Sequence, residues 1–201
     1  NGVELEDKSR LIEPEEKVSR RRALNLPTKG RLFIYAGPLI ARKDPLLLIR
    51  SFLDYVDRND TLCLLGDGPL LPACRRLTGN QQNIFLPGLV HNVADYLRAA
   101  DLFVSASHAE GMPNAVLEAL AVSLPVILSD IPAHRELLDN CSEAGWLFAP
   151  RDPSALGKSF DQAVFDVSTR QAALQLVKRH FSAQSMSIAY QRLYESALNR
   201  A

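Results

Sequence analysis

Short apolar segments alternate with helical patterns along most of this chain, and that alternation limits its fold more than any other feature. Five segments, over residues 32–36, 61–65, 83–86, 101–105 and 125–129, are four or five residues long and mostly apolar on both sides of the pleat. Strands that are buried on both faces are typical of parallel sheets covered by helices. The sequence therefore predicts a parallel sheet in this part of the chain.

Helical patterns fill the intervals between these strands. The clearest pattern has apolar residues at spacings of three and four: Leu48, Ile49, Phe52, Leu53 and Val56. Other helices are predicted over residues 13–22, 93–100, 114–122, 133–139, 154–167, 171–180 and 182–198, the last with an apolar stripe of Met186, Ala189, Tyr190 and Leu193 that is expected to pack on the sheet. The predicted fold class is α/β, a doubly wound, Rossmann-like parallel sheet with C-terminal helices.

Charge and cysteine content narrow the possible functions. Lys and Arg number 23, as do Asp and Glu, so the chain has no net field that would attract nucleic acid. Cys63, Cys74 and Cys141 show no CxxC spacing, which favours a reducing compartment. No apolar run approaches the roughly 18 residues of a membrane span, and the chain does not start with a signal peptide. We therefore expect a soluble, cytoplasmic protein with a small ligand.

The first 30 residues are polar and irregular, unlike the rest of the chain. They begin with Asn1-Gly2-Val3 and no Met, so the sequence is expected to be a piece of a longer protein. We expect residues 1–30 to form a leading segment and residues 31–201 to form the α/β domain.

In an open α/β sheet, ligands bind at the carboxyl ends of the strands, so the loops after the strands are the first places to examine. The loop over residues 66–71 resembles a dinucleotide fingerprint, but Leu71 stands where the third glycine is needed. No acidic residue closes the next strand either, so NAD binding is not expected. The predicted structure is a tight turn that leads into a helix beginning at Pro69.

Residues 107–130 carry the strongest functional signal. The segment leaves a strand and enters a helix near Pro113, and proline suits the first turn because its missing N–H costs nothing there. The N–H groups of Met112, Asn114, Ala115 and Val116 are expected to be free and to point into the crevice, where the positive end of the helix would attract a phosphate.

Two acidic residues frame this helix start. Glu110 precedes it and Glu118 lies one to two turns inside it. A carboxylate beside an anion site needs a partner of its own, and the hydroxyls of a sugar or a ribose would serve. The alternative is that Glu110 caps the helix and Glu118 is an ordinary solvated glutamate.

The loop after the first strand supplies the opposite charge. Gly37 allows a ligand to approach the backbone closely, and Arg42 and Lys43 place two cations before the next helix, unless they are only solvated surface cations. His108 lies at the rim of the same crevice, whereas His134 is expected in the first turn of a helix. Neither histidine is expected to be catalytic.

Taken in order, these features resemble the C-terminal, donor-binding half of retaining glycosyltransferases of the GT-B fold, the group often called group 1 or family 4. The most specific motif is the pair Glu110 and Glu118, separated by seven residues. The same pattern is followed by residues 1–3 as the interdomain crossover, by Lys43, and by residues 65–69, 85–88, 96–101 and 125–130. The resemblance covers nearly the whole chain.

The resemblance implies a role for each matching residue. Glu110 would contact the donor sugar and stabilise charge at its anomeric carbon, Lys43 would neutralise the departing phosphate, and Glu118 would hold the ribose diol. Glu110 and Lys43 are therefore the implied catalytic residues. The implied substrate-binding residues are Glu118, Gly37, Arg42, Leu86, Pro87, Gly111, Met112, Pro113, Asn114, Ala115 and Val116, with Leu86 and Pro87 at the base. No metal and no cofactor are implied.

Three positions depart from the family pattern. Pro38 stands where an arginine is usual, so a second cation is missing from its usual place beside the phosphates, although Arg42 lies nearby in the sequence. Asp44 and Ser123 stand where glycines are usual.

The resemblance implies transfer of a hexosyl group, with retention, from a nucleoside-diphosphate sugar. The acceptor would bind an N-terminal domain that this chain lacks, so residues 1–30 would be an interdomain linker and the chain alone would bind donor without turnover. No nucleic acid is an expected partner, and the full-length enzyme would associate peripherally with a membrane. The alternatives are a GT-B epimerase or phosphorylase domain, a non-catalytic nucleotide-sugar module, and a nucleotide-independent regulator of flavodoxin-like fold.

Overall fold

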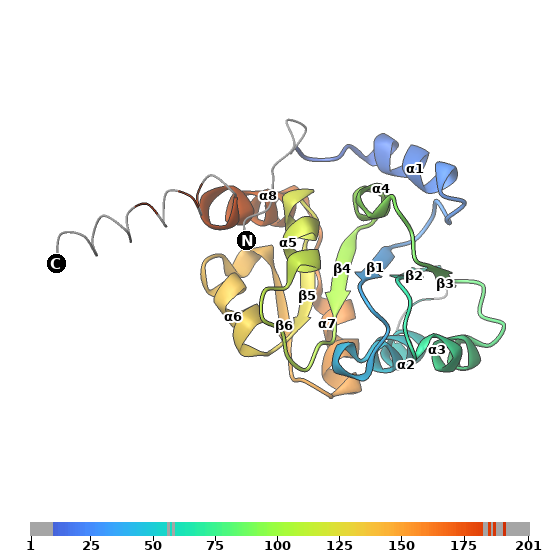
Figure 1. Cartoon of the computed structure of the whole chain (residues 1–201). Coiled ribbons are helices and arrows are strands. Elements are labelled where there is room, and N and C mark those ends of the chain that lie inside the picture. The colour runs from blue at the N-terminus through green and yellow to red at the C-terminus, as the bar shows by residue number, and fades with distance from the viewer. Residues whose placement is uncertain are drawn as a thin grey trace.

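The sheet of this protein has six parallel strands in the order β3-β2-β1-β4-β5-β6 (Figure 1). The computed structural model describes residues 10–55, 57, 59–182, 185, 187 and 191. The strands are β1 (Leu32–Ala36), β2 (Thr61–Leu65), β3 (Ile84–Gly88), β4 (Leu102–Ser105), β5 (Val126–Ser129) and β6 (Gly145–Phe148). The strand order reverses between β1 and β4, which confirms the predicted doubly wound α/β sheet.

Helices connect the strands and cover both faces of the sheet. They are α1 (Pro14–Ala23), α2 (Pro45–Tyr55), α3 (Leu71–Thr78), α4 (Val93–Ala99), α5 (Asn114–Ala121), α6 (Pro132–Asp139), α7 (Pro153–Gln162) and α8 (Val167–Leu176), with short turns η1 (Ala41–Lys43), η2 (Ser142–Ala144) and η3 (Val177–Phe181). In the described part of the chain no helix is long and apolar enough to cross a membrane.

Two apolar cores lie on opposite faces of the sheet. One contains Leu97 of α4, Leu117 of α5 and Leu176 of α8. The other contains Phe52 of α2 and Phe160 of α7, whose rings pack edge to face against Phe33 of β1. Figure 1 shows α2 and α3 on one side of the sheet and α4 and α5 on the other. The helices that follow β1 and β4 therefore leave the sheet toward opposite faces.

Most predicted elements are confirmed, with four differences. The strand β6 at the sheet edge was not predicted, and α3 begins at Leu71 because residues 68–70 form the preceding turn. The helix expected over 154–167 is wrong in extent, because α7 ends at Gln162. The helix expected over 171–180 is wrong in its bounds, because α8 runs from Val167 to Leu176. Asp152 and Asp166 cap the starts of these two separate helices, accepting hydrogen bonds from N–H groups of their first turns. The apolar stripe expected at Met186, Ala189, Tyr190 and Leu193 lies outside the described residues, as do residues 1–3.

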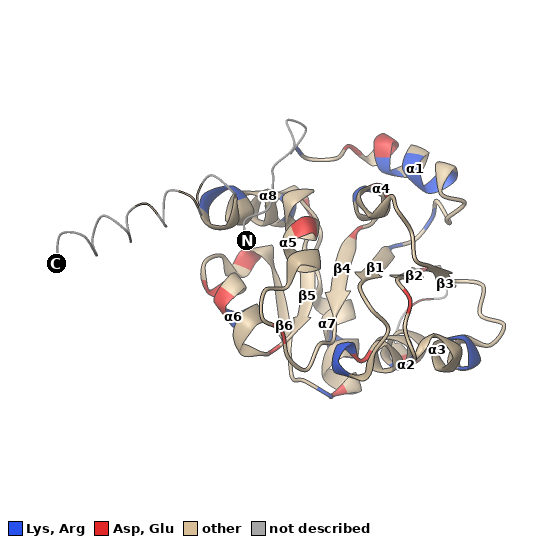
Figure 2. Cartoon of the chain, in the orientation of Figure 1, with Lys and Arg blue, Asp and Glu red and all other residues tan. Residues whose placement is uncertain are grey.

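A buried ion cluster joins α1 to the start of β1. The guanidinium of Arg21, which is only 5% exposed, pairs with Asp101, and Lys17 Nζ lies 3.0 Å from the same carboxylate. Asp101 also accepts a hydrogen bond from the Leu32 N–H at 2.8 Å. Burial alone would raise the pKa of Asp101, but the two cations and the Leu32 N–H hold it below its ordinary value. Figure 2 shows the acidic first turn and basic last turn of α1, an arrangement that suits the helix dipole.

We predict that Arg21→Met lowers the free energy of unfolding by about 3 kcal/mol at pH 7, because it leaves a buried carboxylate with one cation fewer. A lowered carboxyl pKa stabilises the fold above the ordinary carboxyl range, and this stabilisation is lost as the pH falls through the folded-state value. The difference in the free energy of unfolding between variant and wild type, measured by urea denaturation, is therefore expected to become smaller as the pH falls toward 3. Arg22→Met, at an exposed position, is the control. A difference independent of pH would contradict the assigned role of Asp101.

Candidate functional site

A crevice lies at the carboxyl ends of β1 and β4, on the line where the strand order reverses. It consists of two adjoining cavities, of about 470 Å³ and about 340 Å³. The residues that line both cavities come from the last position of β1, the loop after it and the start of α5: Ala36, Gly37, Pro38, Asn114 and Ala115. The two cavities are therefore halves of one site that could hold one extended ligand.

Glycines allow the loops at this edge to meet. Gly66 has φ +134°, and a Cβ there would lie 2.0 Å from the carbonyl oxygen of Gly37. The Gly37 N–H donates to the Leu65 carbonyl at 3.0 Å, and the Tyr35 hydroxyl donates to the Pro38 carbonyl at 3.0 Å. These bonds fix the floor of the crevice.

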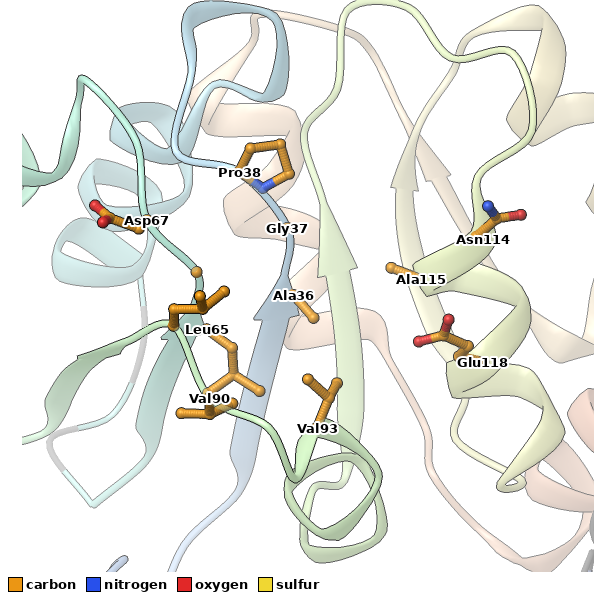
Figure 3. A pocket seen from close by; sticks show the side chains of 12 residues that line it. Ala36, Gly37, Pro38, Leu65, Asp67, Val90, Val93, Asn114, Ala115 and Glu118 are labelled. Carbon is orange, nitrogen blue, oxygen red and sulfur yellow. The ribbon is translucent and has the colours of Figure 1, made fainter.

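The larger cavity is walled by apolar side chains and contains one inward-pointing carboxylate. Leu89, Val90 and Val93, from the segment between β3 and α4, form the apolar wall. Figure 3 shows the Glu118 side chain extending from α5 into the space between α5 and Val93. The carboxylate of Asp67 points away from this cavity. Partial burial raises the pKa of Glu118 above its ordinary value. Among the residues that the structure describes, no lysine or arginine lines this cavity.

The smaller cavity holds the charged groups that the sequence singled out. Lys43 Nζ pairs with one carboxylate oxygen of Glu110, and Arg42 Nη1 lies 3.2 Å from the other. Arg42 also donates to the Ala109 carbonyl at 2.6 Å. Although Arg42 and Lys43 are adjacent in the sequence, they converge on one carboxylate because they lie in the short turn η1. Figure 2 shows this basic turn directly before α2.

The groups around Glu110 favour the charged form of its carboxylate, although the side chain is buried. Its side chain is only 7% exposed, and burial alone would raise its pKa. Hydrogen bonds from Lys43 and Ser107, together with the charges of Lys43 and Arg42, outweigh burial and hold the pKa of Glu110 below its ordinary value. Glu110 is thus a charged group whose own side chain is largely buried, and the alternative that it merely caps α5 is not observed.

The start of α5 offers fewer free amides than predicted. The Asn114 N–H donates to the Met112 carbonyl at 3.0 Å, and the Val116 N–H donates to the Pro113 carbonyl at 2.9 Å. The expectation of four free N–H groups is therefore wrong for these two, because Pro113 begins the helix with a tight turn. The N–H groups of Met112 and Ala115 have no partner among the described residues.

Most of the predicted site residues lie together. The crevice is lined by Gly37, Arg42, Lys43, Glu110, Met112, Pro113, Asn114, Ala115, Val116 and Glu118. Gly111 is exposed beside it and lines neither half. Leu86 and Pro87 line a separate cavity of about 290 Å³, with Tyr96 and Cys63, that shares no residue with the crevice.

Sequence reasoning missed several lining residues and misjudged one neighbour. Leu89, Val90 and Val93 gave no signal, because ordinary apolar side chains become a wall only once β3 and α4 are placed. His108 does not line the crevice but pairs with Asp44, Nε2 to Oδ2 at 2.9 Å. His134 is fully buried in the first turn of α6, where Nδ1 lies 2.8 Å from the Ser129 carbonyl. Among the described residues there is no group of three or more His, Cys, Asp or Glu that could hold a metal ion.

Residues 30–166 match the family model described as glycosyl transferases group 1. The chain is 32% identical over 160 residues to the putative teichuronic acid biosynthesis glycosyltransferase TuaC of Bacillus subtilis (strain 168), which covers 79% of this chain and 39% of the relative. It is 27% identical over 189 residues to the UDP-Gal:alpha-D-GlcNAc-diphosphoundecaprenol alpha-1,3-galactosyltransferase of Escherichia coli, covering 88% of this chain and 48% of that protein. The chain thus spans less than half the length of these relatives.

Solved structures share the fold. A glycosyltransferase from Rickettsia africae ESF-5 superposes with a TM-score of 0.81 at 20% identity, covering all of this chain and 57% of that one. Alr3699/HepE of Anabaena, solved in complex with UDP, superposes with a TM-score of 0.82 at 17% identity, covering 96% of this chain and 56% of that one.

We predict that Lys43→Met raises the pKa of Glu110, because the variant keeps the length of the side chain but removes the main charge that opposes burial. The pKa is measured by following the carboxyl carbon of Glu110 in an NMR titration. Lys158→Met, at an exposed position on α7, is expected to leave the Glu110 titration unchanged. If Lys43→Met has no effect on it, the ion pair does not form in solution.

Proposed function

This chain belongs to the glycosyl transferase group 1 family, and on that premise we propose that it is the donor half of an enzyme that transfers a hexosyl group from a nucleoside-diphosphate sugar with retention. The observation that supports this proposal best is the division of charge along the crevice. One half holds two cations and a buried carboxylate, and the adjoining half is apolar with a single inward-pointing carboxylate. A nucleoside-diphosphate sugar has a matching division, with an anionic centre between two hydroxylated ends.

The diphosphate belongs beside Arg42 and Lys43 in this proposal. Breaking the bond between the anomeric carbon and the phosphate oxygen leaves a cation-like sugar ring and an anionic nucleoside diphosphate. Cations that are already in place stabilise the developing negative charge, and one such donor in a dry site is commonly worth about 3 kcal/mol of barrier. Glu110 lies next to both cations and would contact the sugar hydroxyls and the positive charge of the ring.

The nucleoside belongs in the larger half. Glu118 would accept hydrogen bonds from the two ribose hydroxyls, which compensates the carboxylate for its partial burial. The apolar wall of Leu89, Val90 and Val93 would pack against the base, and this position is proposed in preference to Leu86 and Pro87 because those two line a different cavity.

The departure at Pro38 does not leave the site with one cation. Arg42 reaches Glu110 from the next turn of the same loop, so the smaller half holds two positive groups. The proline at position 38 is therefore no reason to prefer a non-catalytic nucleotide-sugar module over an enzyme. Such a module would be distinguished by full donor binding without transfer when the chain is joined to its N-terminal domain.

We predict that the chain binds nucleoside diphosphates and is stabilised by them. A ligand at a hundred times its dissociation constant raises the free energy of unfolding by about 2.7 kcal/mol. The measurement is a thermal-shift and calorimetry panel of UDP, GDP and ADP with their sugars, beginning with UDP because the Anabaena protein of similar fold was solved with it. If none of these nucleotides binds the wild-type chain, the donor-site proposal fails.

Removing the ribose partner is the second test. Glu118→Ala is expected to weaken binding of the preferred nucleotide by roughly tenfold or more, because a hydrogen bond to a charged group is worth about 1.5–3 kcal/mol. Glu136→Ala, on the exposed face of α6, is the matched control and is expected to bind like the wild type. If wild type and Glu118→Ala bind the nucleotide with equal affinity, Glu118 does not contact the ribose.

The acceptor is proposed to bind a domain outside this chain, so donor binding and transfer are separable. We predict that the chain alone, given UDP-sugars and a diphosphoundecaprenol-linked acceptor sugar of the kind named for the Escherichia coli relative, forms no glycosylated acceptor and releases no UDP by transfer. The acceptor and products are followed by mass spectrometry. Transfer by the chain alone would show that the acceptor site lies within these 201 residues.

A further inference from the structure

The side chains of Asp44 and His108 bridge the two loops that bring charge to the crevice. Asp44 directly follows Lys43 and ends η1, and His108 lies two residues before Glu110. His108 Nε2 and Asp44 Oδ2 are 2.9 Å apart, and each side chain is about three-quarters buried, with exposures of 25% and 24%. The pair therefore joins a segment that follows β1 to a segment that follows β4.

The backbone between these residues is joined as well. The His108 N–H donates to the Arg42 carbonyl at 2.8 Å, and the Arg42 side chain returns across the gap to the Ala109 carbonyl at 2.6 Å. The Asp44–His108 pair adds a third link between these two loops, at the residue that directly precedes α2. On the α2 side, Asp44 Oδ1 accepts a hydrogen bond from the Leu47 N–H at 3.2 Å. The carboxylate of Asp44 thus holds η1 against both its own helix and the opposite loop.

The backbone conformation of Asp44 is one that glycine adopts more easily than aspartate. Its φ is +45°, in the left-handed region that glycine adopts freely, and glycine is the residue that the family pattern has at this position. A side chain held in that region is strained by about 1 kcal/mol. The bonds to Leu47 and His108 are what this chain gains from an aspartate there.

We propose that Asp44 and His108 are positioning residues that hold Arg42 and Lys43 together for phosphate binding, and so give this site the paired cations that Pro38 does not supply. This inference rests on the proposed function. Neither residue lines either half of the crevice. Their effect on a ligand must therefore pass through the two cations, and it must fall on the phosphates and not on the nucleoside.

The first test compares ligands with and without phosphates. Asp44→Gly removes the carboxylate without straining the backbone, and His108→Ala removes its partner. Each variant is expected to raise the dissociation constant of UDP by about tenfold. The dissociation constant of uridine, measured by NMR titration, is expected to change less than twofold. The double variant is expected to be no worse than either single one, because both break the same pair. His108→Gln keeps an N–H donor and is expected to restore most of the UDP affinity.

The second test needs no ligand. The pKa of Glu110 reports how closely the cations approach it, so Asp44→Gly and His108→Ala are expected to raise the pKa of Glu110 in an NMR titration. His180→Gln and Asp161→Asn, at exposed positions elsewhere, are the matched controls. An unchanged Glu110 titration, or equal losses of UDP and uridine binding, would overturn the positioning role. If no nucleoside diphosphate binds the wild type, the proposed function fails, and the Glu110 titration still decides whether the pair positions the cations.

Discussion

The reversal of strand order between β1 and β4 is the constraint on which the site depends. The chain leaves β1 toward α2 on one face of the sheet and leaves β4 toward α5 on the other. The two loops part at the carboxyl end of the sheet, and the crevice is the space between them. Residues far apart in sequence meet there for this reason: Lys43 and Glu110 are separated by 67 positions, yet they form one ion pair.

The two carboxylates of the crevice differ in their burial and in their charged neighbours. Glu110 is nearly enclosed, and the cations against it hold its pKa below the ordinary value. Glu118 is more exposed, its pKa is raised by partial burial, and it faces an apolar wall on which no described residue is a cation. Each carboxylate is therefore suited to a different neighbour. In the proposed function, the enclosed carboxylate lies beside the bond that breaks, and the more open one accepts hydrogen bonds from the ribose hydroxyls.

Sequence reasoning worked where a local pattern carries the information. Apolar runs predicted five of the six strands, and the seven-residue interval between Glu110 and Glu118 pointed to a loop and a helix that line the crevice. It did not predict β6, whose four residues form a short edge strand, or the wall of Leu89, Val90 and Val93, which exists only after β3 and α4 are placed. The Asp44–His108 pair joins residues 64 positions apart, so no window of sequence contains it.

The ion cluster between α1 and Asp101 determines how movement would reach the crevice. Asp101 holds α1 through Arg21 and holds the first residue of β1 through the Leu32 N–H, and Gly37 of the crevice follows at the other end of that strand. The position of α1 is therefore tied to the position of β1 through a single carboxylate. A contact made on α1 and a ligand held at Gly37 therefore act on opposite ends of the same strand.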